Sequence, residues 1–139
     1  MKKLTYSLII SILILSCDNR NDFIIDAYVN ESIDLNLPAY NELIATGGAI
    51  FIEGGVKGII IYHGVGDHYK IYDRNCSYEP SLSCSSIDSL NSGIAYCGCC
   101  TSAFLISNTG EAINAPALLP LKAYSWSLNN NNNILRIFN

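Results

Sequence analysis

The sequence predicts an all-β domain, a small sandwich of short antiparallel strands with two cysteine-bearing loops at one end. The chain has 139 residues, half of them hydrophobic and 14% charged, which suits one compact domain and is too short for a two-domain enzyme. It is rich in Ser, Asn, Gly and Tyr and lacks the Glu/Lys patterning of long helices, so strands and turns are favoured. Short apolar runs between turn signals complete the prediction.

Turn signals separate the apolar runs. Gly54-Gly55 divides the first two runs, and a Gly-rich turn over residues 64–67 precedes the third. Five asparagines at 129–133 join the last two runs as a solvated loop. Residues 38–43 favour one helical turn, and no internal repeat or later domain boundary is visible. The predicted strands span residues 49–53, 57–63, 68–73, 103–106, 124–128 and 134–138.

The N-terminal segment has the pattern of a signal peptide. Two lysines precede an apolar run over residues 4–15, which is shorter than the ~20 residues of a membrane span. The sequence at 14–17, ending in Ser16-Cys17, resembles a bacterial lipobox, in which the cysteine is acylated. We expect a signal peptide over 1–16, lipidation of Cys17, a polar tether over 17–22 and a domain over 23–139. An ordinary secretory signal with an incidental Cys17 is the alternative.

This segment predicts a protein of the bacterial cell envelope that is lipid-anchored and faces the periplasm or the outside; the choice between inner and outer membrane stays open.

Eight basic and twelve acidic residues give a net charge of −4, and no basic cluster follows the first three residues. Nucleic acid is therefore excluded as a partner. Glu79, Asp88 and Glu111 are isolated carboxylates without a partner spacing for acid–base catalysis. A carrier or binding module is favoured over a stand-alone catalyst.

The remaining five cysteines gather within 25 consecutive residues, in two loops rich in Gly, Pro and Ser. Such loops at one end of a small β-structure could clamp a metal, hold a disulfide, or do both. Cys97 and Cys100 have the spacing of thioredoxin-like oxidoreductases, but those place it at a helix N-terminus and the following residues here favour a strand. His63 and His68 flank a hairpin turn outside both loops, which disfavours them as ligands.

The order of the motifs resembles the Rieske domain. The sequence Tyr72-Asp73-x-x-Cys76 is similar to the strand end that delivers the family's first ligand loop, and residues 97–104 are similar to the second loop. A Gly turn at Gly110 and a segment with Pro116 and Pro120-Leu121 follow, as in the family. The resemblance spans about residues 38–138 and implies a β-sandwich fold and a [2Fe–2S] cluster.

Residue by residue, Cys76 and Cys97 match the two thiolate ligands of one iron. Both family histidines are replaced, because Tyr78 stands in the first position and Cys100 in the second. A phenol with a pKa near 10 is a reluctant ligand at neutral pH, so we expect Tyr78 to pack or cap the loop. The resemblance also implies a disulfide that joins the two loops through Cys99, and Cys84 is its expected partner.

Three states of this site stay open. A [2Fe–2S] cluster would take Cys84 as its fourth ligand beside Cys76, Cys97 and Cys100, which abolishes the disulfide. Zinc would bind four of the five thiolates. Without metal, the Cys84–Cys99 disulfide would staple the loops. The function is therefore either electron transfer by a membrane-anchored Rieske-like protein with a redox protein partner, or binding or structural support by a degenerate Rieske-fold lipoprotein.

Overall fold

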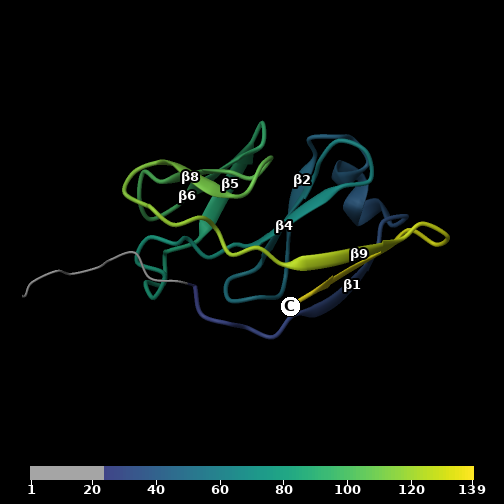
Figure 1. Ribbon diagram of the computed structural model, residues 1–139, viewed down its shortest axis with the longest axis horizontal. Coiled ribbons are helices and arrows are strands. Elements are labelled where there is room, and N and C mark those ends of the chain that lie inside the picture. Colours follow the sequence, from purple (N-terminus) through teal and green to yellow (C-terminus); the bar gives the residue numbers. More distant parts are fainter. Residues whose placement is uncertain (1–23) are drawn as a thin grey trace, which may run out of the picture.

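The structure is a computed structural model that describes residues 24–139 (Figure 1). The predicted signal peptide, the predicted lipidation site Cys17 and the predicted tether lie outside these residues. No helix between residues 24 and 139 has the length and apolar character needed to cross a membrane. The described elements are β1 (Asn30–Asp34), the 3-10 helix η1 (Pro38–Leu43), β2 (Ala49–Ile52), β3 (Ile59–His63), β4 (Tyr69–Asp73), β5 (Ile87–Asn91), β6 (Ile94–Cys97), β7 (Ala103–Leu105), β8 (Glu111–Asn114), β9 (Ser125–Asn129) and β10 (Ile134–Phe138).

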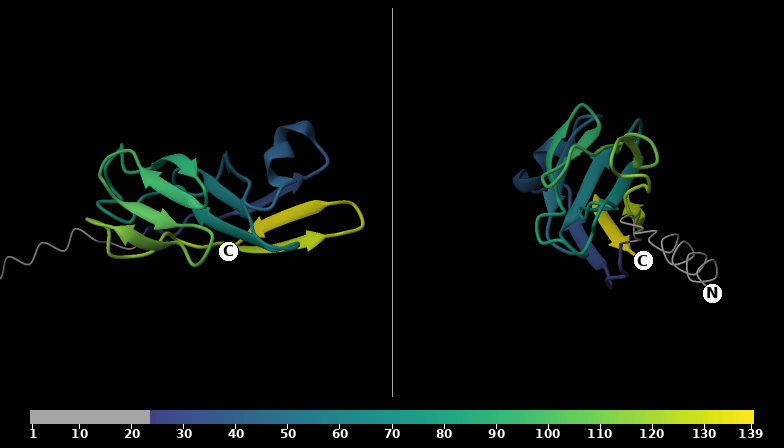
Figure 2. Two further views of the ribbon diagram at one scale, coloured as in Figure 1. Left: turned by 90° about the horizontal axis from the view of Figure 1, so that it is seen from above. Right: turned by 90° about the vertical axis from the view of Figure 1, so that its left-hand side faces the viewer.

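These strands form three antiparallel sheets. Their orders are β1-β10-β9, β2-β3-β4 and β5-β6-β7-β8. Most neighbours are joined by hairpins, and β1 pairs with β10 along its whole length, from Asn30 opposite Phe138 to Asp34 opposite Ile134. The all-β prediction and the antiparallel arrangement are confirmed. Figure 2 shows that the sheets stack into an elongated body.

The β2-β3-β4 sheet is the middle layer, because both of its faces are buried. Ile59, Ile61 and Ile71 belong to a core shared with β1 and β10. Ile60 and Tyr72 point the other way, into a second core shared with the β5-β8 sheet and the cysteine loops. Side chains alternate across a strand, so the near-continuous apolar sequence of β3 follows from its position between two cores.

The predicted strands and the helical turn are present, with ends shifted by a few residues. Four further strands, β1, β5, β6 and β8, lie in segments for which the sequence predicts no strand. Strands β1, β5 and β8 carry polar or exposed side chains at most positions. They lie at the edges of their sheets, where one side faces solvent and the alternation of apolar residues is weak.

Three connections leave the sheets at the same end of the body, as Figure 1 shows beside β6 and β8. They are the segment from β4 to β5 (74–86), the turn between β6 and β7 (98–102) and the segment from β8 to β9 (115–124). The first two carry all the cysteines of residues 24–139 except Cys97, which is the last residue of β6. The predicted placement of two cysteine loops at one end is therefore confirmed.

Candidate metal centre

A buried carboxylate fixes the start of the first cysteine loop. Asp73, at the end of β4, is fully buried. Its Oδ2 accepts hydrogen bonds from the hydroxyl of Tyr124 (2.6 Å) and the N–H of Val56 (2.7 Å), and its Oδ1 accepts one from the N–H of Asn75 (2.7 Å). A buried charge needs several such donors. Asp73 therefore ties the loop to two other segments just before Cys76.

The first loop folds back on itself around Cys76. The N–H of Cys76 donates to the carbonyl of Ser85 (3.1 Å), and the Ser85 hydroxyl donates to the carbonyl of Tyr78 (2.7 Å). Lys57, from the β2–β3 turn, donates to the carbonyls of Ser85 (3.0 Å) and Leu82. Burial lowers the pKa of the Lys57 ammonium, whereas nearby Cys76 and Cys97 would raise it when ionised. A cation thus lies within electrostatic reach of the thiols.

The second loop is a tight turn from Cys97 to Ser102. The N–H of Cys97 donates to the carbonyl of Ser102 (3.0 Å). The next residue, Gly98, donates its N–H to the carbonyl of Ser86 (2.9 Å) and so attaches this turn to the first loop. Both loops are therefore held by backbone hydrogen bonds as well as by the cysteines.

The segment from β8 to β9 (115–124), which contains Pro116 and Pro120 and is called the proline segment below, covers both loops. The Ser77 hydroxyl donates to the carbonyl of Leu119 (2.6 Å), and the Thr101 hydroxyl donates to that of Ala115 (2.8 Å). The N–H of Ala117 donates to the hydroxyl oxygen of Ser102 (2.9 Å). These hydrogen bonds place the segment beside the cysteines.

Three free thiols converge where the loops meet. The sulfurs of Cys76, Cys97 and Cys100 all lie within 4.8 Å of one another. Cys76 and Cys97 are buried, and Cys100 is partly exposed. Thiolates that are about 2.3 Å from one ion, as in zinc sites, are separated by distances of this order. The three sulfurs can therefore bind a common metal centre without a large rearrangement.

The local surroundings make Cys100 the most acidic of the three thiols. Burial raises the pKa of Cys76 and of Cys97, and the hydrogen bond between them raises that of Cys76 further. Burial also raises the pKa of Cys100, but hydrogen bonding with Ser102 and with the neighbouring thiols outweighs this effect, so its pKa lies below the usual range. The Cys100 sulfur is 3.2 Å from the Ser102 hydroxyl oxygen. Cys100 is therefore the first of the three to supply a thiolate.

Cys84 is not brought to this cluster. It forms a disulfide with Cys99, with Cα atoms 5.3 Å apart, which is the pairing that the Rieske resemblance implied. A sulfur in a disulfide offers no thiolate to a metal. The expected four-cysteine set of Cys76, Cys84, Cys97 and Cys100 is therefore reduced to three in this structure.

Tyr78 packs beside the thiols, whereas the two histidines lie at the other end of β4. Tyr78 is partly buried and packs against the core that contains Cys76 and Cys97. The Nε2 of His63 lies 2.7 Å from the carbonyl oxygen of Gly66, within its own hairpin turn. His63 and His68 lie at the opposite end of β4 from the cysteines. The structure thus keeps the histidines away from the three thiols.

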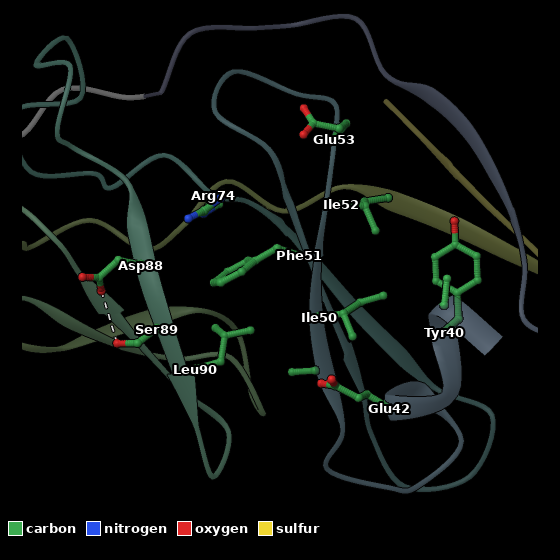
Figure 3. Close-up of a pocket in the computed structure, with 12 residues that line it drawn as sticks. Tyr40, Glu42, Ile50, Phe51, Ile52, Glu53, Arg74, Asp88, Ser89 and Leu90 are labelled. Carbon is green, nitrogen blue, oxygen red and sulfur yellow. Dashed lines mark hydrogen bonds between the residues drawn. The ribbon is translucent and has the colours of Figure 1, made fainter. Parts of the chain in front are cut away.

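A separate open groove lies between β2 and β5, and no cysteine lines it. Figure 3 shows Phe51 pointing from β2 toward β5. The guanidinium carbon of Arg74 lies 4.2 Å from the Phe51 ring centroid, and Arg74 Nε donates to the carbonyl of Ile87 (2.5 Å). Arg74 therefore links the middle sheet to the outer one beside the groove.

Comparisons with known proteins define the class of fold. A chain of the complex of reduced oxygenase and oxidized ferredoxin in carbazole 1,9a-dioxygenase is similar over 80% of this chain and 92% of its own, with a TM-score of 0.50 and 14% identity. This likeness to a Rieske-type ferredoxin shows a Rieske-like fold.

A second similar structure is the ferredoxin of carbazole 1,9a-dioxygenase from Nocardioides aromaticivorans IC177, with a TM-score of 0.47 and 14% identity over 81% of this chain and 98% of its own. No family model matches the sequence, and none of the curated proteins matches it.

Two contributors to the site were missed in the sequence. Lys57 lies in a turn far from the cysteines along the chain, and nothing in its neighbourhood marks it. Ser102 stands at a family position two residues after Cys100, and the resemblance could have assigned it a role. Its contacts with Cys100 and Ala117 place it between the thiols and the proline segment.

Proposed function

We propose that the protein is a membrane-anchored electron carrier that holds a [2Fe–2S] cluster through Cys76, Cys97 and Cys100. The observation that carries this proposal is the convergence of three free thiols on the two loops where a Rieske-like fold presents its ligands. Cys76 and Cys97 would bind one iron, and Cys100 would bind the other. The bound cluster would supply one-electron redox chemistry, and the chain would supply the ligands and their surroundings.

The donor set suits such a cluster at three of its four positions. Thiolates are the usual ligands of iron–sulfur clusters, and the fixed loops hold these three in place before any metal arrives. The fourth position is the one that the resemblance gives to Tyr78; because a phenol is a reluctant ligand at neutral pH, we expect solvent there, with the Tyr78 phenol as the alternative. Lys57 offsets part of the negative charge that three thiolates bring to a partly buried site.

The missing imidazoles set the expected redox range. Rieske centres span roughly −150 to +300 mV, whereas all-thiolate plant-type clusters lie near −400 mV. Replacing an imidazole by the Cys100 thiolate adds negative charge, which favours the oxidised cluster. We therefore expect a midpoint potential below the Rieske range. It should vary little with pH where histidine-ligated centres titrate.

The partners follow from the same proposal. Acylation of Cys17 would attach the protein to a membrane of the bacterial cell envelope, facing the periplasm or the outside. One similar structure is a complex of a ferredoxin with an oxygenase, which supports a redox protein as the partner that exchanges electrons with this chain. The chain itself acts as a carrier and needs no catalytic residues.

Metal content after purification without chelators and without oxygen tests the cluster. We expect reddish-brown protein with equal amounts of iron and acid-labile sulfide, and an electron paramagnetic resonance signal after reduction. Cys100→Ser should lose iron. Cys84→Ser should lose the disulfide and keep the iron, which separates the three-thiol site from the four-cysteine set.

Tyr78→Phe, compared with Tyr96→Phe on the partly exposed face of β6, identifies the fourth ligand. A changed visible spectrum in the first variant alone assigns that position to the phenol, and an unchanged one assigns it to solvent. Colourless protein without iron or sulfide, from anaerobic and aerobic expression alike, would refute the cluster.

A second candidate is a colourless site for one thiophilic ion such as Zn²⁺. The disulfide leaves three thiols, and their mutual distances suit a single ion with a fourth position open to solvent. Stoichiometric zinc that survives dialysis and is lost in Cys100→Ser would favour this reading. The protein would then be a binding or structural lipoprotein.

A further inference from the structure

We infer that the metal centre faces the lipid bilayer, because the chain enters the domain at the same end as the cysteine loops. The inference rests on the lipid anchor proposed above. In a carrier attached by a tether, the site of attachment decides which face of the domain is held near the membrane. Figure 1 shows the start of the described chain beneath β6 and the β9–β10 loop at the opposite end of the body.

Contacts with the proline segment fix the point of entry. Ile24, the first described residue, is 5% exposed and lies in an apolar recess with Ser77 and Leu119. Lys122 donates to the carbonyl of Ile25 (3.0 Å) and forms an ion pair with Asp26 (2.5 Å). Ser77 follows Cys76 directly, so the entering chain is packed against the loop that carries a thiol of the centre.

The length of the tether limits how far this end can lie from the bilayer. Cys17 precedes Ile24 by seven residues, which span at most ~25 Å when fully extended. A lipid on Cys17 therefore keeps the cysteine-loop end within that distance of the membrane surface. Within residues 24–139, the opposite end with the β9–β10 loop lies away from the point where the chain enters the domain (Figure 1).

Exposed apolar side chains at this end are available for contact with the bilayer once the tether holds them near it; Val65 and Ile44 at the opposite end are as exposed (83% and 71%), so the tether, and not apolar exposure, selects the end. Leu118 of the proline segment is 77% exposed, Ile25 is 70% exposed, and Leu82 of the first loop is 44% exposed. Their transfer into the headgroup region removes apolar area from water. We propose that they rest on the membrane surface, so that the centre exchanges electrons or metal with a partner lying in or on the same membrane.

Quenching of tryptophan fluorescence by brominated lipid tests this orientation. The lipidated protein is reconstituted on vesicles of dibromo-phosphatidylcholine or of ordinary phosphatidylcholine, and the single native Trp126 supplies the baseline. Leu118→Trp and Leu82→Trp probe the cysteine-loop end. Val65→Trp is the matched control, because Val65 is 83% exposed and its turn includes Asp67, which lies near Asn133 of the β9–β10 loop.

We expect brominated lipid to reduce the added fluorescence of Leu118→Trp by about half, because the bromine atoms quench only an indole that reaches the boundary between headgroups and acyl chains, where apolar side chains insert. Leu82→Trp should respond in the same direction, and Val65→Trp should match the parent. Equal quenching at both ends, or none at the cysteine-loop end while the protein stays on the vesicles, would overturn the orientation and leave the anchor intact. If protein with an intact Cys17 separates from vesicles as the Cys17→Ser form does, the anchor and the orientation both fail.

Discussion

Removing the Tyr124 hydroxyl tests whether the buried Asp73 holds the cysteine loop in place. Tyr124→Phe deletes one of two hydrogen bonds to Asp73 Oδ2 and leaves the ring volume almost unchanged. A hydrogen bond to a charged group contributes about 1.5–3 kcal/mol, so the free energy of unfolding should fall by about 2 kcal/mol. With a urea m-value of about 2 kcal/mol/M, the midpoint falls by about 1 M.

Asp73→Asn should destabilise the protein more. Three donors converge on two carboxylate oxygens, and an amide replaces one oxygen by a group that only donates. At least one buried donor then faces another donor, which costs about 3 kcal/mol or more. Because both variants disturb one network, the double variant should lose less than the sum of the two.

Urea unfolding of the metal-free protein in the Cys17→Ser background, under non-reducing conditions, measures these changes. Tyr28→Phe is the control, because Tyr28 is 85% exposed and its substitution should change stability by no more than about 0.5 kcal/mol. A Tyr124→Phe loss as small as that of the control, or full additivity with Asp73→Asn, would refute the role of this network.

Three further outcomes are expected. Cys84→Ser should lower the free energy of unfolding by about 3 kcal/mol, because the disulfide with Cys99 spans 15 residues; dithiothreitol should lower the wild type to the same value in urea. Gly110→Ala should lower the free energy of unfolding by about 3 kcal/mol or more, because the added Cβ would lie 2.6 Å from the Tyr72 ring in a backbone with φ +73°. Gly47→Ala, at φ +91° with no atom within 4 Å of the added Cβ, should lower it by about 1 kcal/mol, and thermal melts compare the two variants. Burial raises the pKa of Tyr72 to about 12, so the contribution of Tyr72 to stability should be constant below pH ~10 and fall by up to about 2.7 kcal/mol as pH rises to ~12. In alkaline unfolding curves Tyr72→Phe should make the loss of stability smaller by that amount, and the rest of the loss should persist because burial also raises the pKa of Cys76, Cys97 and Tyr124.

Strands β3 and β4 could be predicted from the sequence because burial on both faces requires apolar side chains at most of their positions. Residues 59–63 and 69–73 are enclosed by two cores, so their apolar pattern is dense and bounded by glycine turns. Strand β5 has the sequence Ile-Asp-Ser-Leu-Asn, and only its first residue is buried. Its pairing with β6 is a property of the assembled sheet, and the local sequence gives little sign of it.

The site divides in the same way. The order of the cysteines placed Cys76, Cys97 and Cys100 correctly at one end of the fold, since their spacing along the chain is a local feature. Whether Cys84 is a ligand or a disulfide partner depends on which sulfur lies nearest after folding. That choice depends on tertiary geometry, so the sequence leaves both roles of Cys84 open.

Because both faces of β4 are buried, insertions and deletions of single residues within this strand are disfavoured. A strand whose Ile71 and Tyr72 enter different cores tolerates neither the insertion nor the deletion of one residue, since either would exchange its two faces. The same shift would rotate Cys76 away from Cys97. The exposed stretch 81–83 in the following loop has no two-sided alternation to preserve. Insertions and deletions among related chains should therefore accumulate there, while the number of residues from Tyr69 to Cys76 stays constant.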